Sequence, residues 1–170
     1  MEKYKFTLPV ISGVTKPIDI HNEEGKVRGR VKRFYPHIWN KAFEIMRPGW
    51  EVNIKANEDE KEITIKEHFR WLRNEWSLYE NDRFVGYLKD IKIIEFGNTQ
   101  QLEYHGKKYY FIGKSMETKT SIFDEQDNLI AKIDYDYSKF GGQKELYLYS
   151  NELPVTLIVS IDYISALKKR

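Results

Sequence analysis

Basic side chains alternate with apolar and small ones along one short segment. It reads Lys26-Val-Arg-Gly-Arg-Val-Lys-Arg33. Because side chains in a strand alternate between two faces, a strand here would turn Val27, Gly29 and Val31 toward the core and present cations on the other face. Such a row can hold phosphate groups through charge-assisted hydrogen bonds. The alternative is a solvated outer face whose cations pair with acids of the neighbouring strand. The candidate anion-binding residues are Lys26, Arg28, Arg30, Lys32 and Arg33.

An aromatic stripe follows directly in the sequence. Between residues 36 and 47 the strand period stops, and Trp39, Phe43 and Met46 recur at a spacing that places them on one helix face. Pro48 and Gly49 close the segment. We therefore predict a short amphipathic helix inserted between strands at residues 36–47, with Trp39, Phe43 and Met46 as candidate contacts to a membrane or a partner.

The residues that usually carry catalysis or bind metals form no recognisable motif. The sequence has no cysteine, which excludes thiol-ligated metal sites and disulfides. It also lacks a nucleophile elbow, a phosphate-binding loop and a dinucleotide fingerprint. The four histidines are dispersed without the spacing of a metal-binding pair. We expect no enzymatic activity, no cofactor and no metal at these histidines: His21, His37, His68 and His105.

A calcium site is the remaining metal hypothesis. Asp124, Asp127, Asp134 and Asp136 lie close in sequence, but calcium needs six to eight oxygen ligands, usually from a compact loop with a glycine turn. No such loop pattern is present. Turn and strand-edge carboxylates are the favoured interpretation.

Charge and length narrow the function further. The 170-residue chain has a formal net charge of +2, so its overall charge indicates no nucleic-acid partner. The first residues lack the apolar run of a signal peptide. We expect one domain over residues 1–170, located in the cytoplasm or peripheral at the inner membrane surface.

Most of the sequence has the period of strands with one buried face. Tyr4, Phe6 and Leu8 alternate with other residues, and Ile63 and Ile65 continue the pattern. Polar turn signals separate such runs at roughly ten-residue spacing, which favours a sandwich or a barrel.

Three segments repeat one hairpin pattern. Each has an apolar strand end, a polar turn, and then apolar, small and apolar residues at alternate positions; the copies begin at Ile20, Leu78 and Ile122. A small residue in the inward row indicates that something bulky approaches the sheet there. The predicted small inward positions are Gly29, Gly86 and Ala131.

The C-terminal segment, residues 153–167, is apolar around the whole helical wheel and must therefore be buried on all sides. It is shorter than the roughly 20 residues that span a bilayer, so we predict a core helix and no transmembrane span. Ser150 and Asn151 are candidate N-caps. Asp162 would be enclosed, and we expect a tyrosine hydroxyl or an inward Lys or Arg to satisfy it.

The helix and the strands fit one architecture. A helix with its side chains is about 10–12 Å across, which suits the interior of a barrel wider than eight strands. Fifteen helical residues extend about 22 Å, close to the length of a seven-residue strand. The rest of the chain has room for roughly a dozen short strands.

These residues resemble a known family. The resemblance rests on the repeated hairpins, the run Tyr-Phe-Ile-Gly-Lys at residues 110–114, and the Glu152-Leu-Pro-Val and Ser-Ile-Asp-Tyr sequences near the C-terminus. Together they resemble the tubby-like superfamily over nearly the whole chain, nearest to bacterial tubby C-terminal-like domains. Plant LURP-one-related proteins and phospholipid scramblases are related to this branch.

The resemblance implies a fold and a class of ligand. The implied fold is mainly β: a closed antiparallel barrel of about twelve strands around a central hydrophobic C-terminal helix. Because tubby binds phosphoinositides and scramblases act on lipids, the implied function is a non-enzymatic lipid- or anion-binding module whose partners are anionic phospholipid headgroups. The alternative is a protein-interaction or structural domain with no small-molecule ligand.

Overall fold

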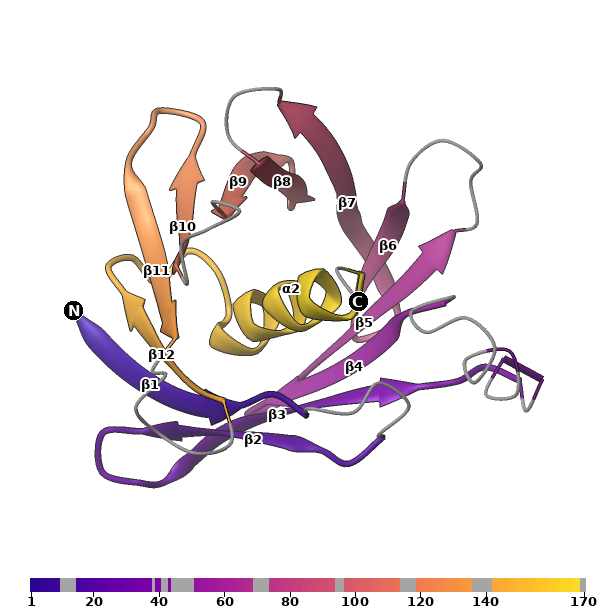
Figure 1. Cartoon of the computed structure of the whole chain (residues 1–170), viewed down its shortest axis with the longest axis horizontal. Helices are drawn as coiled ribbons and strands as arrows, with labels where there is room; N and C mark the ends of the chain where they lie inside the picture. The colour runs from indigo at the N-terminus through magenta and orange to yellow at the C-terminus, as the bar shows by residue number, and fades with distance from the viewer. Residues whose placement is uncertain are drawn as a thin grey trace.

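Twelve β-strands close into an antiparallel barrel, and the C-terminal helix α2 runs through its interior (Figure 1). The computed structural model describes residues 1–9, 15–37, 39–40, 43, 51–68, 74–93, 97–113, 119–135 and 142–168. Each strand pairs with its sequence neighbours, and β1 closes the barrel against β12. The predicted fold class is confirmed. The elements are β1 (Glu2–Thr7), β2 (Ile18–Asn22), β3 (Val27–Phe34), β4 (Asn53–Glu58), β5 (Lys61–His68), β6 (Glu75–Glu80), β7 (Arg83–Ile93), β8 (Gly97–Tyr104), β9 (Lys107–Gly113), β10 (Lys119–Asp124), β11 (Leu129–Tyr135), β12 (Gln143–Leu148) and α2 (Val155–Lys168).

The three repeated hairpins are β2–β3, β6–β7 and β10–β11, and they share one irregularity. In each, the register shifts on the turn side of the small inward residue. The second strand there contains one extra residue that has no partner on the first strand. A β-bulge of this kind resets the alternation of side chains. The expectation that Val27 faces the core is therefore wrong: it is 45% exposed, as are the equivalent residues Phe84 (51%) and Leu129 (38%).

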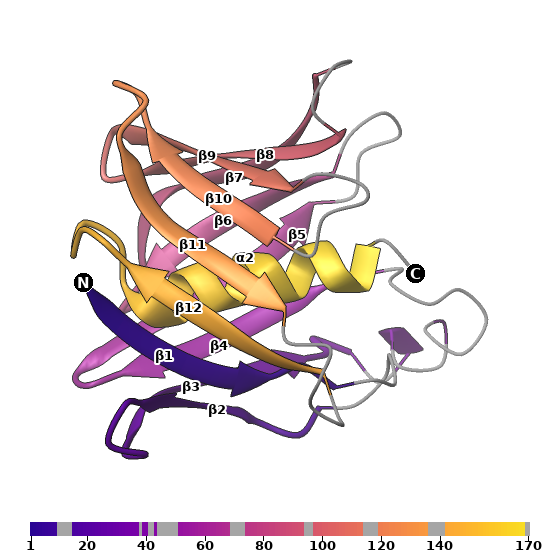
Figure 2. The same ribbon diagram turned by 60° about the vertical axis from the view of Figure 1, so that its left-hand side comes forward.

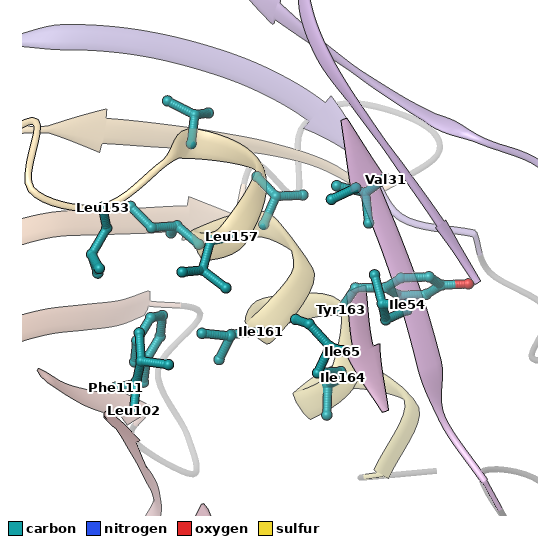
Figure 3. Packing of buried hydrophobic residues seen from close by; sticks show 14 of the residues in the cluster. Val31, Ile54, Ile65, Leu102, Phe111, Leu153, Leu157, Ile161, Tyr163 and Ile164 are labelled. Atoms are coloured by element: carbon teal, nitrogen blue, oxygen red, sulfur yellow. The ribbon is translucent and has the colours of Figure 1, made fainter. Parts of the chain in front are cut away.

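The core lies between the helix and the inward rows of the wall. Leu157, Ile158 and Ile161 of α2 have no exposed surface. Figure 3 shows Leu157 and Ile161 on the side of the helix that faces Leu102 and Phe111 of the wall. Since each fully buried aliphatic side chain contributes about 1.5–3 kcal/mol, the helix is a large part of the stability of the barrel.

The helix begins against a distant strand. Pro154 supplies the first carbonyl oxygen, which accepts from the amide of Leu157 at 3.1 Å. The carboxylate of Glu58, in β4, accepts from both the amide and the hydroxyl of Thr156 at 3.0 Å. A carboxylate there satisfies a free amide and complements the positive end of the helix dipole. The predicted caps, Ser150 and Asn151, precede the helix and do not cap it.

Polar residues of the helix are tied to the wall. The expectation for Asp162 is confirmed, because the ammonium group of Lys144 on β12 donates to its carboxylate at 2.7 Å. Near the last turn, Lys168 donates to Glu67 of β5 at 2.5 Å. Because these charges are paired, the helix does not carry the free-energy cost of an unpaired buried charge. The two ion pairs also fix the position of the helix in the barrel.

At Gly29 the wall lies close against the helix. A Cβ atom there would lie 2.4 Å from Cγ2 of Thr156 and 2.9 Å from the carbonyl oxygen of Asn57. The prediction that a bulky group approaches the small inward residue is confirmed at this position, and the bulky group is the helix itself.

The two ends of the barrel differ. At one end, which we call the helix-entry end, lie the N-terminus of the chain and the start of α2; at the other, the helix-exit end, lie the last turn of α2 and the C-terminus (Figure 2). Strand β3 runs from the entry end to the exit end, so Lys32 lies closer to the exit end than Arg28 does.

Candidate anion-binding face

Three of the four basic residues of β3 lie on the outside of the barrel, as predicted. Arg28, Arg30 and Lys32 are exposed, whereas Gly29 and Val31 between them are buried. Lys26 is also exposed in the turn before β3.

Arg33 does not belong to this face, and its assignment as an anion-binding residue is wrong. It follows Val31 by two residues, so the strand period turns it inward, where it has no exposed surface. Its Nη2 donates to the carbonyl oxygen of Glu51 at 2.7 Å, and its guanidinium lies 4.8 Å from the ring centre of Tyr35. Arg33 therefore joins the end of β3 to the start of β4.

Several cations of the face have acidic neighbours. Lys26 pairs with Glu24 at 2.9 Å, Arg28 with Asp59 at 2.9 Å. Arg30 donates to Asp19 of β2 at 2.8 Å. Exposed pairs of this kind contribute about 0–1 kcal/mol. A phosphate can therefore compete for these cations at little energetic cost, although the alternative, a solvated paired face, accounts for the same contacts.

Lys32 differs from the other cations. It stands directly opposite Lys55 in the β3–β4 register, and like charges directly opposite each other destabilise a sheet. Lys55 pairs with Glu62 at 3.1 Å, but the side chain of Lys32 forms no ion pair or hydrogen bond within the described part of the chain. We call Arg30, Lys32 and Lys55 the basic patch.

Lys55 is not among the residues predicted from the sequence, although its strand carries a signal for it. It alternates with Ile54 and Ala56, which are fully buried, so the period alone indicates that Lys55 faces outward. Its position opposite Lys32 depends on the register of the hairpin, which the sequence does not define.

The aromatic stripe is exposed where the structure describes it. Trp39, Asn40 and Phe43 are helical, and the side chains of Trp39 (72%) and Phe43 (51%) lie largely in solvent. The amide of Asn40 donates to the carboxylate of Glu51, two residues before β4, so this helical segment is held at the exit end of the β3–β4 hairpin. Met46 lies outside the described residues.

A cleft of about 930 Å³ opens at the helix-entry end. Carboxylates along it accept hydrogen bonds from tyrosine hydroxyls: Tyr4 donates to Glu2, and Tyr109 donates to Glu152 at 3.2 Å. These carboxylates already have partners, and Glu58 caps the helix. We therefore interpret this region as the place where the barrel closes around the start of α2.

This closure makes the protein sensitive to alkaline pH. Burial, together with the neighbouring carboxylates, raises the pKa of Tyr4 and of Tyr109 to about 12, whereas an unfolded tyrosine titrates near pH 10. The folded state thus holds these protons more tightly. The stability that they contribute is complete below about pH 10 and is lost as the pH rises toward about 12.

We therefore expect the urea midpoint of unfolding to fall steeply over that range, and less steeply in Tyr4→Phe and Tyr109→Phe. Tyrosinate absorbance should show these two residues ionising well above pH 10, near pH 12. If every tyrosine of the native protein ionised together near pH 10, this account of the closure would be contradicted.

The remaining metal hypothesis finds little support. Among the described residues, no group of three or more His, Asp or Glu side chains is arranged to hold a metal ion. Asp124 instead accepts hydrogen bonds from the amides of Gln126 at 2.9 Å and Asn128 at 2.8 Å, which closes the β10–β11 turn. Asp134 pairs with Lys132 at 3.0 Å. Asp136 lies outside the described residues.

Comparison with known proteins agrees with the architecture. A family model described as Tubby C-terminal like domain matches residues 4–169. No curated protein and no solved structure gives a significant match. In the part of the chain that the structure describes, no helix has the length and apolar character needed to span a membrane.

Proposed function

Because the chain belongs to the Tubby C-terminal like domain family, we propose that it is a non-enzymatic module that binds anionic phospholipids at the cytoplasmic surface of the membrane. The observation that carries the proposal is Lys32, an exposed cation that lies opposite Lys55 and whose side chain has no partner among the described residues. An anion bound between the two lysines would remove their repulsion.

The expected affinity is weak and sensitive to salt. Each Lys or Arg near an anionic leaflet contributes about 1 kcal/mol, so the three cations of the basic patch together provide a roughly hundredfold preference for an anionic surface. The exposed rings of Trp39 and Phe43 add interfacial contacts of the kind that aromatic residues make at membranes. Such a protein would bind the membrane reversibly.

Removing two charges from the basic patch tests the proposal. Arg30→Gln with Lys32→Gln should weaken co-sedimentation with phosphatidylserine-containing vesicles by roughly thirtyfold, since about 2 kcal/mol of attraction is lost. The melting temperature should stay nearly unchanged, because both side chains are exposed.

The matched control removes the same charge from the far side of the barrel. Lys108 on β9 and Lys119 on β10 are exposed, and these strands lie across the barrel from β3. Lys108→Gln with Lys119→Gln should leave vesicle binding close to that of the wild type. Equal losses in the two double variants would mean that net charge, and not the basic patch, determines binding.

A further inference from the structure

The wall of the barrel opens along the seam between β1 and β2. Register pairing between these strands is confined to Tyr4 with Asn22 and Lys5 with His21, although β1 continues to Thr7 and β2 begins at Ile18. A cavity of about 550 Å³ lies where the pairing stops. We call it the seam groove.

The floor of the seam groove is apolar. Phe6, Leu8 and Ile18 line it, and each is at least nine-tenths buried, so the groove reaches the edge of the core. Pro9 and Pro17 also line it. A volume of this size falls within the range of small-molecule sites, which are mostly apolar with a few polar groups that orient the ligand.

The rim of the groove carries unpaired positive charge. Lys5 and Lys16 line it, and neither side chain forms an ion pair or hydrogen bond with another described residue. The acid of the lining, Asp19, accepts from Arg30 at 2.8 Å, so its charge is already compensated. The rim is therefore complementary to an anion at the mouth of an apolar cavity.

We infer that the seam groove takes an acyl chain of an anionic phospholipid, with the phosphate held at the mouth by Lys5 and Lys16. The apolar floor excludes a purely polar ligand, because such a ligand would lose its hydration without gaining hydrogen bonds there. The rim favours a headgroup with a net negative charge over a zwitterionic one, because the choline cation of a zwitterionic headgroup would be repelled by the two lysines.

The groove adjoins the basic patch through the Asp19–Arg30 pair. This inference therefore rests on the proposed function, because the patch would hold the membrane surface while the groove takes one lipid from it. The two can nevertheless fail separately, since the patch needs a charged surface and the groove needs a single lipid molecule.

Calorimetric titration of the full chain with soluble, monomeric dioctanoyl phosphatidic acid tests the groove. We expect this lipid to bind at least about tenfold more tightly than glycerol 3-phosphate, which lacks the chains, octanoate, which lacks the phosphate, or dioctanoyl phosphatidylcholine, which is zwitterionic. Octanoate or glycerol 3-phosphate binding as tightly as phosphatidic acid would overturn the assignment.

Filling the groove should block it. Thr7 and Pro17 line the groove with exposed side chains, so Thr7→Trp and Pro17→Trp should each reduce phosphatidic acid binding at least about tenfold. Tyr149→Trp, at an exposed position at the helix-entry end, is the control and should bind normally. Unchanged binding in both groove variants would refute the inference.

A second readout needs no variant. A phospholipid with a photoreactive acyl chain should cross-link to residues 6–9 and 16–18 of the wild type, and cross-links confined to other strands would contradict the groove.

If the wild type binds anionic vesicles but not soluble phosphatidic acid, the groove is wrong and the proposed function survives. If it binds the soluble lipid in the groove but ignores vesicles, the proposed function fails and the groove stands.

Discussion

A chain that ends at Ser150 is expected to be unfolded or insoluble. It would lack nine apolar side chains that are almost fully buried in the barrel, Leu153 and eight residues of α2. At about 1.5–3 kcal/mol each, their burial is worth roughly 13–27 kcal/mol, whereas a domain is usually stable by about 5–15 kcal/mol in total. The truncated barrel would also leave Lys144 and Glu67 without their helix partners.

The measurement is the thermal transition of the purified chains. A chain that ends at Lys168 keeps the whole of α2 and should unfold in one cooperative step, like the full-length protein. A cooperative transition in the chain that ends at Ser150 would mean that the strands fold without the helix, and that the helix is not the core on which the barrel depends.

Gly86→Ala is expected to destabilise the protein much more than Gly106→Ala. Both glycines have positive φ, at +154° and +78°, so both substitutions cost about 1–2 kcal/mol of backbone strain. A Cβ atom at Gly86 would also lie 1.8 Å from the carbonyl oxygen of Glu103 on the neighbouring strand, whereas none of the described atoms lies within 4 Å at Gly106. The steric clash adds about 1–3 kcal/mol of overpacking, measurable as a shift in the urea midpoint.

The inward glycine at the helix provides a coupled test. Gly29→Ala would press against Cγ2 of Thr156, and Thr156→Ser removes that methyl group while keeping the hydroxyl that donates to Glu58. The double variant should therefore lose less stability than the sum of the single variants, with a coupling of about 0.5–3 kcal/mol. Strict additivity would show that Gly29 does not contact the helix.

The architecture follows from sequence because two patterns are strong. Apolar residues that alternate every second position indicate strands with one buried face, and a helix that is apolar on every side must be enclosed. Together the two patterns indicate a barrel around a helix. The repeat also identified the three hairpins. Val27 was placed on the wrong face because a bulge changes the phase of the alternation, and the side chains that signal a strand do not reveal where an extra residue is inserted.

The site was less predictable, because it depends on long-range register. Arg33 was grouped with its neighbours by charge, although the strand period turns it inward. The pairing of Lys32 with Lys55 requires the alignment of two strands, and the cap by Glu58 joins residues 98 positions apart. The seam groove forms where the β1–β2 pairing stops, which no local pattern marks.

Vesicle co-sedimentation of the wild-type protein is the decisive measurement for lipid binding. Surface electrostatics are screened within about 10 Å at 0.1 M salt and within about 3 Å at 1 M. We therefore expect binding to vesicles that contain phosphatidylserine at low salt, loss of that binding at about 1 M salt, and little binding to phosphatidylcholine vesicles at either. Failure to bind anionic vesicles at low ionic strength would contradict the claim, and a protein-interaction domain would then be the better account.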